Sequence, residues 1–175
     1  MATLAGPFLV TAALLAAGGA SKVVKPATTA RALGEMGLKI PPVTVRVGAA
    51  AELAVAAGAL AGGGRVFAAL VAASYLSFAG FVLAALRRGT PLSTCGCFGV
   101  TDTPPTVTHV VVNLAAAAIA GAVAVGSASA GGLSDIITME GSLLSRATFV
   151  VLTAVSAWFA YLALTALPKL QAAHR

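Results

Sequence analysis

Five apolar segments, each about as long as a lipid bilayer is thick, constrain this chain more than any other feature of its sequence. A helix needs about 20 predominantly apolar residues to cross the hydrocarbon core. Segments of about this length occupy residues 3–20, 43–61, 66–86, 109–125 and 147–167. The sequence therefore predicts an all-α integral membrane protein, a polytopic bundle of four to five transmembrane helices.

The composition agrees with a membrane protein and excludes the other large classes. Hydrophobic residues make up 59% of the 175 residues, charged residues make up 9%, and the mean hydropathy is +0.98. Soluble domains carry about 25% charged residues, and disordered chains are poor in apolar residues. The net charge is +6, but the basic residues are scattered singly, so we expect no nucleic-acid partner. We interpret them as topology signals and lipid contacts of a multi-pass protein in the cell membrane, inner or plasma.

The first apolar segment, residues 3–20, and the polar segment after it, residues 21–42, each need an interpretation beyond hydropathy. The first segment ends in small residues like a signal peptide, but no Lys or Arg precedes it, so we expect a retained span. The second is the most polar long segment of the chain. Pro26 favours a helix start there, and Gly37 favours a stop. The sequence therefore predicts a short helix at the membrane surface, over residues 30–38.

The basic residues are distributed unevenly between the two sides that five spans would create. One side holds nine of the 11 basic residues. This side includes the segment between the first two spans, the loop after the third span and the C-terminal tail. These nine are Lys22, Lys25, Arg31, Lys39, Arg46, Arg87, Arg88, Lys169 and Arg175. The other side has Arg65 and Arg146. The positive-inside rule predicts that the richer side is cytoplasmic and that the N-terminus is outside.

Both cysteines of the chain lie in one loop, PLSTCGCFG, at residues 91–99. A disulfide needs Cα atoms about 4.4–6.8 Å apart, which Cys95 and Cys97 reach if the chain turns at Gly96. A disulfide that closes so short a ring adds little stability to the folded state. Strained or exposed disulfides are the labile, catalytic ones. We interpret the two cysteines as a redox pair. The alternatives are ligands for a soft metal, Cu(I) or Hg, or incidental cysteines.

A carboxylate lies near the middle of the second predicted span, at Glu52. A charge at that depth costs at least about 2.5–3.5 kcal/mol, so it needs a partner. Lys22 is the favoured partner, and Lys25 is another candidate. Arg46 is six residues away and does not face Glu52 on a helix. The pair is either a structural link between helices or a protonatable group that serves thiol or quinone chemistry.

Three further polar residues flank the cysteine loop. Arg88, with its neighbour Arg87, precedes the loop and would favour the thiolate form of a nearby cysteine. His109 begins the next span and is interpreted as a helix-end histidine or as a proton acceptor. Asn113 lies one turn further and needs an internal hydrogen-bond partner.

The ordered set of these residues carries a resemblance. It consists of Lys22 after the first span, Glu52 in the second, Arg88-Gly89, CGCFG at residues 95–99, and Asn113 in the next span. The set resembles the MauE family of methylamine-utilisation proteins, within a wider DoxX-like group of small redox-associated membrane proteins.

The resemblance extends over about residues 10–120. It predicts a single membrane domain over residues 1–175. Within that domain, a core over about residues 10–125 would be followed by an extra span over residues 147–167.

The resemblance implies an assistant in thiol–disulfide chemistry, either a membrane thiol:disulfide oxidoreductase or an accessory to one. Family members work with a thioredoxin-like partner, and DoxX-like relatives suggest quinone as a possible electron carrier. Cys95 and Cys97 become the redox pair, and Lys22, Glu52 and Asn113 become a polar framework around them. Arg88 and His109 join that framework because they flank the loop.

The sequence departs from the family pattern at two points, and two functions other than redox chemistry stay open. Val112 stands where the family often has Arg, and the charge bias favours cytoplasmic cysteines where the family role expects the outer face. The side that the loop faces therefore stays open. The alternatives to redox chemistry are a soft-metal transporter that uses Cys95 and Cys97, and a non-catalytic subunit of a larger membrane complex.

Overall fold

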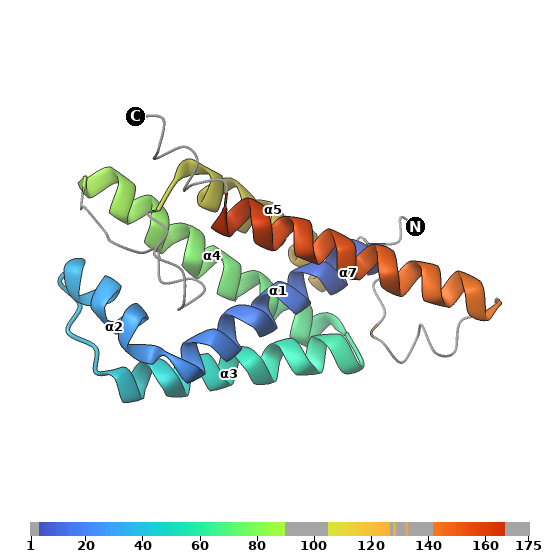
Figure 1. Ribbon diagram of the computed structural model, residues 1–175, viewed down its shortest axis with the longest axis horizontal. Helices are drawn as coiled ribbons and strands as arrows, with labels where there is room; N and C mark the ends of the chain where they lie inside the picture. The colour runs from blue at the N-terminus through green and yellow to red at the C-terminus, as the bar shows by residue number, and fades with distance from the viewer. Residues whose placement is uncertain (1–3, 90–104, 127, 129–131, 133–141, 167–175) are drawn as a thin grey trace.

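The computed structural model describes residues 4–89, 105–126, 128, 132 and 142–166 (Figure 1). These residues form helices and connecting turns, with no strand among them. Five of the helices are long and apolar enough to cross a membrane. They are α1 (Ala5–Val24), α3 (Pro42–Ala61), α4 (Arg65–Arg88), α5 (Val107–Ala124) and α7 (Leu143–Thr165). The predicted polytopic all-α architecture is confirmed, with five candidate spans.

A short helix, α2 (Pro26–Glu35), follows α1 and packs against α3. Pro26 occupies its first turn, where the fixed φ of proline suits a helix start. The helix ends at Glu35, and Gly37 follows it with a φ of +86°, which suits the left-handed position after a helix. At ten residues, or about 15 Å, α2 is too short to cross a bilayer. The predicted short helix is present, but it begins four residues earlier than expected, because the proline sets its start, and ends three residues earlier, at Glu35.

Two helix pairs, α1 with α3 and α4 with α5, make the most extensive contacts in the bundle (Figure 1). The first pair is close because Gly19 faces α3. A Cβ atom at Gly19 would lie 3.1 Å from the carbonyl oxygen of Ala49 and 3.2 Å from the backbone nitrogen of Leu53. Small residues allow such approaches in lipid, where packing rather than water drives helix association.

The core lies where α1, α3, α4 and α5 meet. Alanine supplies much of it, and larger side chains fill the space between the alanines. Its largest buried members are Phe8, Leu15, Val71 and Tyr75. The Tyr75 hydroxyl donates to the carbonyl oxygen of Thr11 at 2.7 Å, so the polar end of this side chain is satisfied within the bundle.

The last span, α7, lies on the outside of the bundle along α1 (Figure 1). Most of its surface is exposed, and Trp158 and Phe159 are 60% and 66% exposed. In a bilayer such apolar residues face lipid. Near its C-terminal end, Leu164 is buried and packs with Leu14 of α1.

The two ends of the bundle differ in how tightly they close. At one end, Gly63 and Gly64 turn the chain from α3 into α4, and Arg65 Nε donates to the Ala124 carbonyl at 2.9 Å. At the other end, a cleft of about 280 Å³ lies among α2, α3 and α4. The polar residues singled out in the sequence lie toward this second end.

Candidate functional site

An ion pair joins α1 to α3 inside the bundle. Lys22 Nζ binds Glu52 Oε2, and the two side chains are 5% and 21% exposed. The same ammonium lies 4.4 Å from the ring centroid of Phe78 on α4, so a cation–π contact adds to the pair. Glu52 is about 15 Å along α3 from Pro42, which is near the middle of a span. The predicted Lys22–Glu52 pairing is therefore present, and it neutralises a carboxylate at membrane depth.

The other basic candidates do not pair with Glu52. Arg46 instead donates from Nε to the Val23 carbonyl at 3.1 Å, where it holds the end of α1. This agrees with the helical spacing, since residues six apart do not meet on one helix face. The choice of Lys22 over Arg46 in the sequence analysis is confirmed.

The ion pair lines the cleft, and Arg88 lies further along α4, beyond the residues that line it. Lys22 and Glu52 line it, together with Ser77, Phe78 and Phe81 of α4. Arg88 continues the Ser77–Phe81 face of α4, because residues four and seven apart lie on one side of a helix. Its Nη1 donates to the carbonyl oxygen of Met36 at 3.3 Å, which ties the end of α4 to the end of α2.

His109 caps the start of α5. The backbone N–H of Thr106 donates to His109 Nδ1 at 3.3 Å, and the Thr106 hydroxyl lies 2.9 Å from the same nitrogen. In return, the His109 backbone N–H donates to the Thr106 carbonyl at 3.0 Å. A backbone N–H only donates, so Nδ1 accepts, and from this pattern we assign the ring proton to Nε2. His109 is a helix-end histidine, as one of its two interpretations predicted, and with the ring proton on Nε2 that nitrogen is a hydrogen-bond donor.

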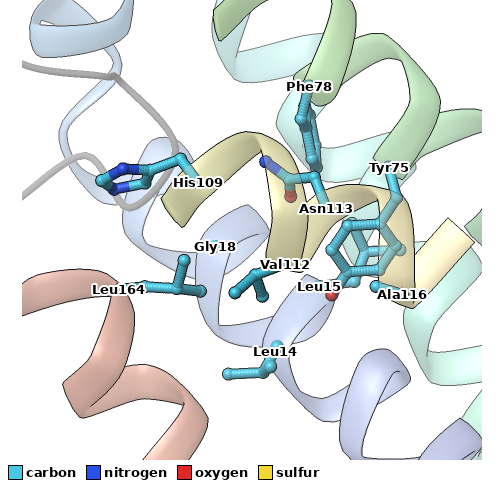
Figure 2. A pocket seen from close by; sticks show the side chains of 10 residues that line it. All are labelled: Leu14, Leu15, Gly18, Tyr75, Phe78, His109, Val112, Asn113, Ala116 and Leu164. Atoms are coloured by element: carbon cyan, nitrogen blue, oxygen red, sulfur yellow. The ribbon is translucent and has the colours of Figure 1, made fainter. Parts of the chain in front are cut away.

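His109 and Asn113 lie one helical turn apart and line the same small cavity (Figure 2). They are 1% and 5% exposed, and the cavity has a volume of about 30 Å³. Its remaining lining comes from α1, α4, α5 and α7, through Leu14, Leu15, Gly18, Tyr75, Phe78, Val112, Ala116 and Leu164. A buried water needs at least about 10–15 Å³, so the cavity is large enough for one.

Sequence reasoning missed two residues that connect these features. Phe78 lines both the cleft and the cavity, and its ring also contacts that of Tyr75 edge-on, with centroids 5.9 Å apart. The other is Thr106, three residues before His109. Its position was readable, because threonine three residues before a polar side chain is the spacing of a capping box. The role of Phe78 depends on how α4 meets α1, which no local pattern reveals.

Cys95 and Cys97 lie outside the described residues. By sequence, the segment that carries them leaves α4 after Arg88 and enters α5 at Val107. The described candidates therefore fall into a directly bonded pair, Lys22 and Glu52, and a pair that shares a cavity, His109 and Asn113. Arg88 stands apart from both, at the outer end of α4.

Comparison with known proteins identifies the family. The family model described as methylamine utilisation protein MauE matches residues 1–126. The chain belongs to the MauE family. No curated protein and no solved structure matches the chain. All five described site candidates lie within the matched part.

The matched part of this MauE protein ends before α7, so α7 is an addition to the region that the family model covers. Val112, which stands where an arginine was expected, packs against the small apolar cluster of Leu14 and Leu164. An arginine there would bring a charge to the contact among α1, α5 and α7. Valine therefore suits a chain in which α7 covers this face.

Proposed function

We propose that this MauE-family membrane protein is a thiol:disulfide oxidoreductase, or an accessory to one, that serves methylamine utilisation at the inner or plasma membrane. Cys95 and Cys97 cycle between dithiol and disulfide. Oxidation of the dithiol forms one S–S bond and releases two electrons and two protons. A disulfide in a thioredoxin-like partner accepts them and becomes a dithiol, or a quinone accepts them and becomes a quinol. The reverse direction introduces electrons into a disulfide-containing client.

The observation that carries this proposal is the gathering of polar side chains at one end of an otherwise apolar bundle. Lys22, Glu52, His109 and Asn113 are buried or half-buried, and Arg88 ends α4. The cysteine-bearing segment connects α4 to α5 at this same end. Buried polar groups in a membrane protein are costly and commonly functional, so their position beside that segment supports a chemical role.

The cleft supports the quinone version of the proposal, in line with the DoxX-like resemblance that the sequence suggested. Its walls include the aromatic rings of Phe78 and Phe81, and Lys22 provides an ammonium at one end. Its volume of about 280 Å³ lies just below the range of about 300–1,000 Å³ for small-molecule sites. These residues therefore suit a ring head group rather than a complete long-chain molecule. The quinone would supply two-electron chemistry, and the chain would bind and orient it.

The test of the proposed function is cysteine replacement in cells that make a disulfide-containing client. We expect Cys95→Ser and Cys97→Ser each to abolish client oxidation, since a disulfide needs both sulfurs. Ser93→Ala in the same loop is the matched control and should leave client oxidation intact. Client oxidation is read from the gel mobility of the alkylated client.

Full client oxidation by both serine variants would overturn the proposal. Stoichiometric Cu(I) or Hg(II) bound to protein purified under reducing conditions, and lost in both variants, would then identify a transporter. An intact larger membrane complex in the Cys95→Ser, Cys97→Ser double variant, with unchanged activity, would instead identify a non-catalytic subunit.

A further inference from the structure

The Nε2 atom of His109 is a buried donor that its helix cap does not use. The cap occupies Nδ1, which accepts from Thr106, so Nε2 carries the ring proton. Within the described part of the chain, Nε2 has no hydrogen-bond partner, although the residue is only 1% exposed. A buried donor without a partner costs about 1–3 kcal/mol, so such groups usually bind something.

The cavity that His109 lines has the size and the chemistry of a water site. Its volume of about 30 Å³ exceeds the least space that one water needs, and it is far too small for a cofactor or a lipid chain. Asn113 adds a second polar side chain, itself 5% exposed, to a lining that is otherwise mainly apolar. An amide both donates and accepts, so it can complete the hydrogen bonds of a water that accepts from Nε2.

We propose that the cavity between α1, α4, α5 and α7 binds a single water molecule. The water accepts a hydrogen bond from His109 Nε2 and forms a second with the side-chain amide of Asn113. Thr106 acts as a positioning residue, because its bonds to Nδ1 fix the tautomer that makes Nε2 a donor. Leu164 of α7 closes the site from the side that the family model does not cover.

This water site does not depend on redox chemistry at the cysteines, but it bears on proton movement. His109 is the third residue of α5, and Asn113 is the seventh, so the site lies within about 10 Å of the start of the helix. A bound water there brings a proton carrier into the end of the bundle that the cysteine-bearing segment adjoins.

Histidine-selective ¹⁵N labelling tests the proposal directly in the full-length chain in lipid bilayers. The chain has two histidines, so His174→Ala leaves one labelled ring. Solid-state NMR then reads the tautomer from the two ring nitrogens and reads magnetisation transfer from water to the Nε2 proton. We expect the Nε2-protonated tautomer with clear transfer from water. A proton on Nδ1, or an Nε2 proton without transfer from water, would overturn the proposal.

Two matched variants locate the water. Ala116→Val adds two methyl groups inside the cavity and should abolish the transfer from water, whereas Ala118→Val on the exposed side of α5 should leave it unchanged. Persistence of the transfer in Ala116→Val would contradict the site. Thermal unfolding of both variants checks that they are folded. Thr106→Val should raise the share of the Nδ1-protonated tautomer several-fold, and an unchanged share would contradict its positioning role.

Discussion

The helices of this bundle pack closely at one end and leave a cleft at the other. At the end where α3 turns into α4, small residues let the helices close on one another, and the ring of Phe67 lies where a Cβ atom of Gly58 would be. At the other end, a cleft of about 280 Å³ separates α2, α3 and α4, and an ion pair crosses from α1 to α3. Among the described residues, the closed end is characterised by small residues in close contact. The open end holds the buried polar groups.

Hydrogen bonds from two arginine side chains to backbone carbonyl oxygens also differ between the closed end and the open end. Arg65 donates to the Ala124 carbonyl at 2.9 Å and holds α4 directly to the end of α5. Arg88 donates to the Met36 carbonyl at 3.3 Å and holds α4 only to the short helix α2. Because α2 is not a span, we expect the open end to open locally more easily than the closed end. Substitutions at the ion pair, at the α1–α3 contact, at the α5 cap and at the two arginines test this difference.

Removing one partner of the ion pair should have the largest effect. Glu52→Gln leaves the Lys22 ammonium buried without a counter-charge, which costs about 3–5 kcal/mol of unfolding free energy. Replacing both, as Lys22→Met with Glu52→Leu, should recover most of that loss, because apolar residues of similar volume suit the site. Denaturant unfolding in mixed micelles measures both. A double variant as unstable as the single variant would show that the pair is not the cause.

Separating α1 from α3 should have the next largest effect. Gly19→Val places atoms against the α3 backbone, beside the ion pair, and overpacking of this kind costs about 1–3 kcal/mol. Gly80→Val on α4 is the matched control, since nothing lies within 4 Å of a Cβ atom there. The same unfolding measurement should show little change for the control. Equal losses in both variants would mean that helix propensity, not close packing, sets the effect.

The cap of α5 should contribute less to the free energy of unfolding than the ion pair or the α1–α3 contact. Thr106→Val removes the hydroxyl bond to His109 Nδ1 and should cost about 1 kcal/mol, within the range of about 0.5–2 kcal/mol for N-cap losses. His109→Gln should cost less, because glutamine at this position also accepts from the backbone N–H of the cap residue. The ratio of the two losses in thermal unfolding checks the geometry. A larger loss in His109→Gln would contradict capping as the main structural role.

The two arginine ties should have the smallest effect on global stability, below about 1 kcal/mol each, because both side chains are exposed. Their local effects should differ. Arg88→Met should speed hydrogen exchange in α2 alone, and Arg65→Met should speed it in the first turn of α4 alone. Mass spectrometry of exchanged peptides resolves the two regions. Faster exchange throughout the bundle in Arg88→Met would contradict a loosely tied open end.

Particular residues show what the sequence could predict. Hydropathy located all five spans, because a run of about 20 apolar residues in a chain with so few charged residues indicates a transmembrane helix. The partner of Glu52 was predictable as well, because a carboxylate at membrane depth needs a cation and Lys22 ends the preceding span. Pro26 placed the start of α2 correctly, although the predicted helix began four residues later.

Long-range packing was not predictable in the same way. Phe78 lines both the cleft and the cavity because of the angle at which α4 meets α1, and a phenylalanine inside an apolar span carries no local sign of that role. The free donor of His109 depends on which ring nitrogen Thr106 occupies. The role of His109 as a proton acceptor stays a prediction, whereas the assignment of Nε2 as a hydrogen-bond donor needs the cap geometry.

A thiol-trapping gel shift in cells tests whether Cys95 and Cys97 form a redox pair, because it reads the state of both cysteines without assuming a client. The cysteines are alkylated with a heavy maleimide before and after reduction, using membrane-permeant and impermeant reagents in parallel. We expect a shift of two thiols only after reduction, and the impermeant reagent then reports which side the pair faces. Two free thiols without reduction, protected by added Cu(I) or Hg(II), would contradict it.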